Sequence, residues 1–194
     1  MLFQNIWKLL KAYFSKEDRL FINAVQSITS QRIYNVNIYK LAVNHSSASE
    51  INNYGFKESN ERLEYLGDAV LGMVVADYLF TQFPFKEEGF LTEIRSKIVN
   101  RESLNLISRK IGLNQLINYH KSNYTIIPKS IFGDSLEALI GAVYRDKGFD
   151  KCRKFIIEKI ILPHYDMDKL INTTTNHKSK LIEWAQKENK KIAF

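Results

Sequence analysis

Two segments of the chain place acidic residues one helical turn apart, directly before a run of apolar residues. In NERLEYLGDAVLGMVVA, Glu64 and Asp68 are four positions apart. In IFGDSLEALIGAVYRD, Asp134 and Glu137 are three positions apart. Residues at these spacings share one face of an α-helix. The sequence therefore predicts two helices, each with a pair of carboxylates at the start of a buried segment.

Most acidic side chains on a helix are simply solvated, and that interpretation suits Glu61. It suits Asp68 and Glu137 less well, because the residues one turn further on belong to the apolar runs. If the two helices pack together, their carboxylates converge and repel one another where the dielectric constant is low. A hard divalent cation relieves this repulsion, and oxygen ligands favour Mg²⁺ or Mn²⁺ over zinc. The pattern therefore indicates a divalent-metal site.

Each apolar run also contains a glycine, Gly72 in one and Gly141 in the other. Glycine inside a helix costs about 1 kcal/mol relative to alanine. Close approach of a second backbone is one physical reason for accepting that cost. We therefore expect the two helices to pack side by side through these glycines.

Other chemistries have less support in the sequence. No histidine follows a glutamate by three positions, so the Glu-x-x-His motif of di-iron helix bundles is absent. There is no His-Asp pair and no glycine-rich phosphate loop. The single cysteine, Cys152, has no histidine partner by spacing, and we interpret it as a buried structural residue.

The spacing of the apolar residues favours an all-α fold without strands. The expected helices cover residues 17–28, 37–44, 60–83, 87–113 in two pieces, 130–146 and 150–164. Asn100 is expected to cap the second piece of the 87–113 segment. We also expect residues 1–16 to form an amphipathic helix that packs on the domain.

The composition limits the class of partner and the compartment. The net charge is +7 and the pI is near 9.3, which suggests an anionic partner such as nucleic acid, although charge alone is weak support. The apolar runs are too short to span a membrane. A lone cysteine excludes an intrachain disulfide and favours a reducing compartment, so we place the protein in the cytoplasm.

Three segments resemble the ribonuclease III family. NERLEYLGDAVL closely resembles the signature motif of that family, and GDSLEALIGAVYRDKGF resembles its second acidic motif. LAVNHSSAS lies where the family usually has His-Arg-Ser, with Ser46 here in place of the arginine. The order and separation of the segments fit the family over residues 18–165.

The resemblance implies a homodimeric endoribonuclease that cleaves double-stranded RNA in RNA processing, including rRNA processing. A water activated by a divalent metal would make staggered cuts and leave 5′-phosphate and 3′-hydroxyl ends. Mg²⁺ is the implied cofactor, with Mn²⁺ as a substitute. The alternative is a non-catalytic double-stranded RNA-binding or scaffold homologue of the same fold, and the presence of all the acids argues against it.

The resemblance also assigns roles to individual residues. The implied metal ligands are Glu64, Asp68, Asp134 and Glu137. Asp68 and Glu137 are the two that we expect to be indispensable. Glu61 and Glu88 match acidic positions that contribute to RNA cutting with less direct metal contact. Tyr65 falls where the family usually has a phenylalanine that inserts into the partner subunit.

These inferences give a domain organisation. Residues 1–168 are expected to form the catalytic domain, with a helical extension at its start, and residues 169–176 a linker. Residues 177–194 resemble the opening helix and first strand of a double-stranded RNA-binding domain, and the chain stops where the rest of such a domain would begin. Lys178 and Lys180 are the expected RNA contacts there, while a plain basic amphipathic helix is the alternative interpretation.

Overall fold

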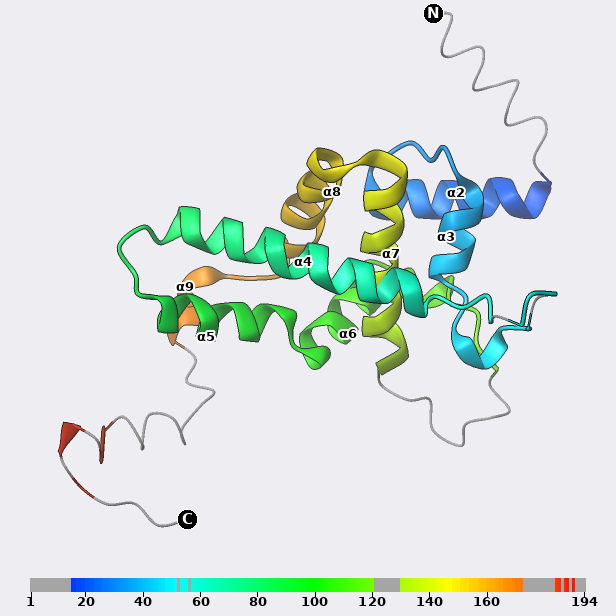
Figure 1. Ribbon diagram of the computed structural model, residues 1–194. Helices are drawn as coiled ribbons and strands as arrows, with labels where there is room; N and C mark the ends of the chain where they lie inside the picture. The colour runs from blue at the N-terminus through cyan, green and yellow to red at the C-terminus, as the bar shows by residue number, and fades with distance from the viewer. Residues whose placement is uncertain are drawn as a thin grey trace, which may run out of the picture. The chain divides into compact units, whose positions relative to one another are not determined.

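The computed structural model describes residues 15–51, 53–55, 57–120, 130–172, 184–185, 187–188 and 190. These residues form helices joined by turns, and they contain two isolated bridges but no strand. The predicted all-α fold class is therefore confirmed (Figure 1). No helix in this described part of the chain combines the length and apolarity that crossing a membrane requires.

The observed helices follow the expected order closely. The α-helices are α2 (Lys16–Thr29), α3 (Val36–Ala42), α4 (Glu61–Gln82), α5 (Glu88–Val99), α6 (Arg101–Lys110), α7 (Ser130–Lys147), α8 (Phe149–Phe155) and α9 (Met167–Asn172). The shorter elements are the 3₁₀ turns η1 (Ser46–Ala48) and η2 (Leu113–Gln115) and the π-helical η4 (Ile156–Ile161). The expected cap at Asn100 is confirmed, because its side chain accepts a hydrogen bond from the N–H of Ser103 at 2.9 Å.

Contacts divide the chain into two compact units, residues 1–164 and residues 165–194. The described part of the second unit contains α9 and a few residues around Trp184. Residues 169–172, which the sequence assigned to a linker, form the end of α9. This helix forms because Asp166 caps it, accepting a hydrogen bond from the N–H of Lys169 at 3.2 Å.

Several sequence-based expectations lie outside the described residues. They concern the helix over residues 1–14, the remainder of the linker from residue 173, and the lysines Lys178 and Lys180.

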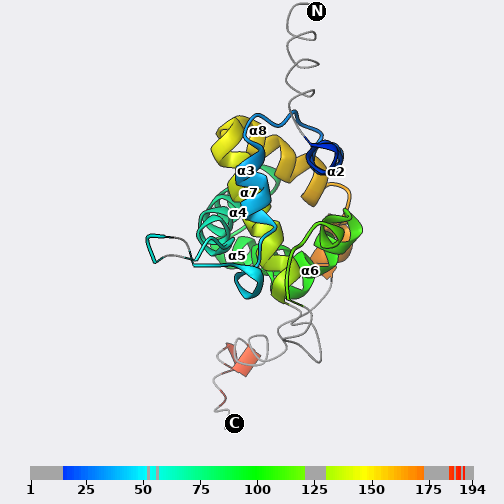
Figure 2. The ribbon, with the colours of Figure 1, turned by 90° about the vertical axis from the view of Figure 1, so that its right-hand side faces the viewer.

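Helix α7 is the central element of the first unit. Helices α3, α4, α6 and α8 all pack on it, as Figures 1 and 2 show. Its apolar run is buried on every side, including Leu136, Leu139 and Val143. Helix α4 contributes its own buried run, including Leu71 and Val74. The two runs that the sequence predicted to be buried therefore form the core, and each carries its acids at one end.

The backbones of α4 and α7 touch where the helices cross. A Cβ atom added to Gly67 would overlap the carbonyl oxygen of Glu137, and one added to Gly141 would overlap that of Leu63. Only glycine allows this approach. Close packing through Gly141 is confirmed, but the expected partner Gly72 is wrong, and Gly67 takes its place.

The reason is the position of each glycine around α4. Gly72 is five residues beyond Gly67, a rotation of about 140° around the helix, so it faces a different neighbour. A Cβ atom on Gly72 would meet the guanidinium of Arg95 on α5, with Nη2 at 2.7 Å. On α4 the crossing point therefore lies among the acids and not within the apolar run.

Candidate metal centre

Three carboxylates from two helices converge at this crossing. Glu64 comes from α4, while Asp134 and Glu137 come from α7. Each offers an oxygen atom, and these atoms all lie within 4.8 Å of one another. The three side chains are partly buried. Oxygen atoms at these separations can bind one hard divalent cation together.

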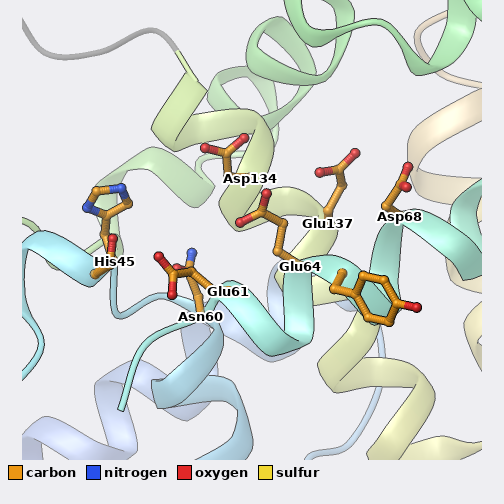
Figure 3. Close-up of a pocket in the computed structure, with 9 residues that line it drawn as sticks. His45, Asn60, Glu61, Glu64, Asp68, Asp134 and Glu137 are labelled. Carbon is orange, nitrogen blue, oxygen red and sulfur yellow. The ribbon is translucent and has the colours of Figure 1, made fainter. Parts of the chain in front are cut away.

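The carboxylates line a cavity of about 510 Å³, shown in Figure 3. The lining residues are His45, Ser46, Asn60, Glu61, Glu64, Tyr65, Asp68, Asp134 and Glu137. All the acids at this wall belong to the two motifs that the sequence singled out.

The start of α4 is fixed by a small network of hydrogen bonds. Asn60 precedes the helix, and its carbonyl oxygen accepts hydrogen bonds from the N–H groups of Leu63 and Glu64 at 2.9 Å each. Its own N–H donates to the carbonyl oxygen of Asn44 at 2.9 Å. Its side-chain Nδ2 donates to Ser135 Oγ on α7 at 3.4 Å. Asn60 therefore links the two helices directly beneath the acids.

Burial, together with the close spacing of the acids, changes their protonation. Burial raises the pKa of Glu137 to about 8, and the charges of Asp68 and Glu64 contribute to the increase. Burial also raises the pKa values of Glu64 and Asp134. The positive charge of Arg101 on α6 lowers all three pKa values, but not enough to cancel the increase. A bound cation would compensate this repulsion fully, which fits the all-oxygen donor set.

Asp68 lies beside this group but outside it. Its side chain lines the same cavity and is exposed, and its charge raises the pKa of Glu137. The structure therefore brings three of the four predicted ligands within the distance that one cation requires, and it places Asp68 at the neighbouring position on the cavity wall.

The two remaining acids occupy different places. Glu61 lines the cavity, and its Oε2 accepts a hydrogen bond from Ser59 Oγ at 3.1 Å. Glu88 begins α5, where its Oε1 accepts a hydrogen bond from Thr92 Oγ1 at 2.8 Å. It does not line the cavity, and Figure 1 shows the start of α5 near the end of α4 that is remote from the acids.

His45 is a cavity residue to which the sequence gave no role. Its Nδ1 accepts a hydrogen bond from the N–H of Ser47 at 3.1 Å, so the neutral ring carries its proton on Nε2. Burial lowers the pKa of His45, while the charges of Asp134 and Glu61 oppose that change. Its position in LAVNHSSAS, just before the first acidic motif, is a sequence signal that could have identified it.

Comparison with solved structures shows that this helical fold is that of a nuclease domain. The nuclease domain of ribonuclease III from Campylobacter jejuni superposes with a TM-score of 0.65 at 31% identity, covering 74% of this chain and 98% of that one. Dicer from Giardia intestinalis shares the fold alone, with a TM-score of 0.61 at 19% identity, covering 84% of this chain and 22% of Dicer.

Sequence comparison identifies the family. Residues 35–164 match the family model described as ribonuclease-III-like. "Ribonuclease 3" of Azobacteroides pseudotrichonymphae is 40% identical over 100% of this chain and 73% of its own length. The Bacteroides fragilis protein of the same name is 43% identical over 82% of this chain. The matched region covers 55% of that relative's length, so this chain spans about half of it. The chain belongs to the ribonuclease III family of endoribonucleases.

Proposed function

We propose that the first unit binds Mg²⁺, with Mn²⁺ as a substitute, and cleaves double-stranded RNA. The observation that carries this proposal is the convergence of Glu64, Asp134 and Glu137 within 4.8 Å. Burial raises the pKa of Glu137 to about 8, and the charges of Asp68, Glu64 and Asp134 add to the increase, so three charged carboxylates at this separation are unfavourable without a cation. We assign Asp68 as the fourth acid of the site because it lines the same cavity.

The residues of the site have separate tasks in this proposal. A bound cation would neutralise charge and would lower the pKa of a coordinated water molecule for attack on a phosphodiester. Glu64 and the two acids of α7 hold the cation, and Glu137 loses its proton when the cation binds because only the carboxylate is a ligand. The products are a 5′-phosphate and a 3′-hydroxyl. The family resemblance gives Glu61 and Glu88 a contribution to cutting with less direct metal contact, and of the two only Glu61 lines the cavity.

Double-stranded RNA is the substrate that fits the charge of the protein. The net charge of +7 favours a polyanion. A-form RNA hides its base edges, so recognition through phosphates and 2′-hydroxyl groups is expected to show little sequence preference. Lys178 and Lys180, in the segment that resembles the start of a double-stranded RNA-binding domain, would add phosphate contacts. We assign the activity to RNA processing in the cytoplasm.

A second copy of the chain fits an exposed apolar stripe on α4. Tyr65 is 82% exposed, Met73 52% and Phe80 71%, and helical spacing places them within one face of α4. The related Campylobacter jejuni nuclease domain has a region involved in dimer formation. Because Tyr65 also lines the acid cavity, a partner on this stripe would lie beside the catalytic centre. Two such centres in one dimer would make the staggered cuts.

Cleavage of a labelled RNA duplex tests the proposal. The purified chain should cut the duplex in Mg²⁺ and leave it intact in EDTA, and a single-stranded RNA of the same sequence should be cut much more slowly. End analysis should find 5′-phosphate and 3′-hydroxyl groups. A chain that binds the duplex but never cuts it in Mg²⁺ or Mn²⁺ would instead be a non-catalytic RNA-binding homologue.

A further inference from the structure

Helix α6 presents a polar stripe to the first turn of α7. Arg101, Asn105 and Arg109 follow one another at four-residue spacing and therefore share a face of α6. The carbonyl oxygen of Arg101 lies 3.7 Å from the position of a Cβ atom on Gly133. The guanidinium of Arg109 stacks over the ring of Phe132, 4.5 Å from its centroid. Both contacts fall immediately before Asp134.

Asn105 makes the most specific of these contacts. Its Oδ1 accepts a hydrogen bond from the backbone N–H of Gly133 at 2.8 Å. Asn105 is only 9% exposed, and its helix neighbours Leu104 and Ile107 belong to the apolar core. A buried amide costs roughly 1–3 kcal/mol unless it is hydrogen-bonded, so an apolar residue would pack here at lower cost. The asparagine therefore needs a reason beyond packing.

Gly133 is shaped for this contact. A Cβ atom at position 133 would stand 3.2 Å from Asn105 Oδ1, which is tighter than most packed atoms, and in ordinary contact with Leu104 Cβ at 3.5 Å. The absence of a side chain at Gly133 thus lets the Asn105 amide reach the backbone of α7.

The place of the contact connects it to the metal centre. Asp134 follows Gly133 directly, and Glu137 lies one turn further along the same helix. The crossing of Gly67 and Gly141 fixes α7 beyond these acids, and Asn60 bonds to Ser135 only at 3.4 Å. On the other side of Asp134, the backbone N–H of Gly133 donates the shorter hydrogen bond, 2.8 Å, to Asn105 Oδ1 and holds the first turn of α7 against α6.

We propose that Asn105 is a positioning residue for the metal centre, whose amide oxygen holds the first turn of α7 so that Asp134 and Glu137 face Glu64. This inference rests on the proposed function, because it assumes that the cluster holds a cation. Asn105 touches neither substrate nor metal. Its effect on cleavage passes through the geometry of the two acids.

The test compares Mn²⁺ binding and stability in four full-length chains. Asn105→Leu has a similar volume and no acceptor, while Asn105→Asp keeps an acceptor oxygen at the same place. Ser108→Ala is the control, because Ser108 is buried on the same helix and its hydroxyl has no hydrogen-bond partner. Titration calorimetry with Mn²⁺ measures affinity, and thermal denaturation in EDTA measures stability without metal.

Asn105→Leu should weaken Mn²⁺ binding about tenfold, as loss of an outer-shell partner does at other metal sites. Asn105→Asp should bind Mn²⁺ at least as tightly as the wild type, and Ser108→Ala should bind it equally. If Asn105→Leu does not fold, Asn105→Ser gives the same comparison with a side chain too short to reach Gly133.

The outcomes separate this inference from the proposed function. A wild-type chain that binds no Mn²⁺ contradicts the proposed function itself. Wild-type affinity in Asn105→Leu, or in Asn105→Ser, overturns the positioning role alone. In a further outcome, Asn105→Leu and Ser108→Ala lose thermal stability equally, with no change in Mn²⁺ affinity. That result would show that Asn105 contributes only to packing, and it would also overturn the inference.

Discussion

Glu137 combines two properties that conflict in the absence of a cation. It is partly buried, and it lies among other carboxylates. Its pKa is raised from 4.5 to about 8 in the folded chain, so the protonated form favours folding. The stabilising contribution is complete below pH 4.5 and is lost as the pH rises through 8. Above that pH the metal-free chain carries an unfavourable buried charge.

Substitution of Glu137 should change the thermal stability of the metal-free chain in EDTA. Glu137→Gln resembles the protonated side chain, so its Tm should exceed that of the wild type by about 2–4 °C at alkaline pH, and the difference should shrink as the pH falls. Mg²⁺ should raise the Tm of the wild type more than that of the variant, because the cation binds the carboxylate. Circular dichroism melts measure both effects. Parallel pH profiles for the two proteins would contradict the account.

The pairing of acids along each helix was predictable at the residue scale because helical spacing is a local property. Glu64 pairs with Asp68, and Asp134 with Glu137, by counting residues alone. The roles of Asn60 and Asn105 were not predictable, because each depends on a contact between segments far apart in the sequence. No rule of spacing indicates that an asparagine on α6 reaches the backbone of α7.

The crossing of α4 and α7 controls the site at the scale of elements. Carboxylates from two helices can share a cation only if the helix backbones approach closely. Gly67 and Gly141 permit this approach because neither has a side chain at the crossing. The sequence predicted the helices and their buried faces, because apolar periodicity reports both. The sequence-based prediction chose the wrong glycine of α4, because tertiary packing decides which glycine faces α7.

Two alanine substitutions in α4 distinguish these glycines. Gly67→Ala places a methyl group against the carbonyl oxygen of Glu137, so it should destabilise the chain by about 1–3 kcal/mol or more and weaken metal binding. Gly72→Ala is the matched control. Its methyl group meets only the flexible end of Arg95, and better helix propensity offsets that contact. Urea denaturation gives both free energies, and equal effects would show that the crossing does not run through Gly67.

At the scale of the whole molecule, the proposed interface on the apolar stripe of α4 would connect assembly to catalysis. Tyr65 is largely exposed in one subunit and also lines the acid cavity. Burial of this stripe by a second copy would remove apolar surface from water and bring the two centres into one assembly. The tyrosine hydroxyl would need a polar partner or solvent in that interface.

Tyr65→Ala should therefore weaken the dimer without unfolding the subunit. Loss of a central aromatic contact typically costs about 2 kcal/mol of binding free energy, so the dissociation constant should rise roughly thirtyfold. Sedimentation equilibrium measures this change. Tyr54→Ala is the control, because Tyr54 is 86% exposed and lies outside α4. If both substitutions raised the dissociation constant equally, or if neither raised it, the interface would lie elsewhere.

The central claim is that the acid cluster holds the cation with which the chain cuts RNA. The most direct measurement compares duplex cleavage and duplex binding in Mg²⁺ for Glu137→Gln and for Glu102→Gln, an exposed acid of α6 outside the cavity. Glu137→Gln should abolish cleavage and leave RNA affinity nearly unchanged, while Glu102→Gln should behave as the wild type. Cleavage by Glu137→Gln at close to the wild-type rate would contradict the account, because it would show that Glu137 does not bind the catalytic metal.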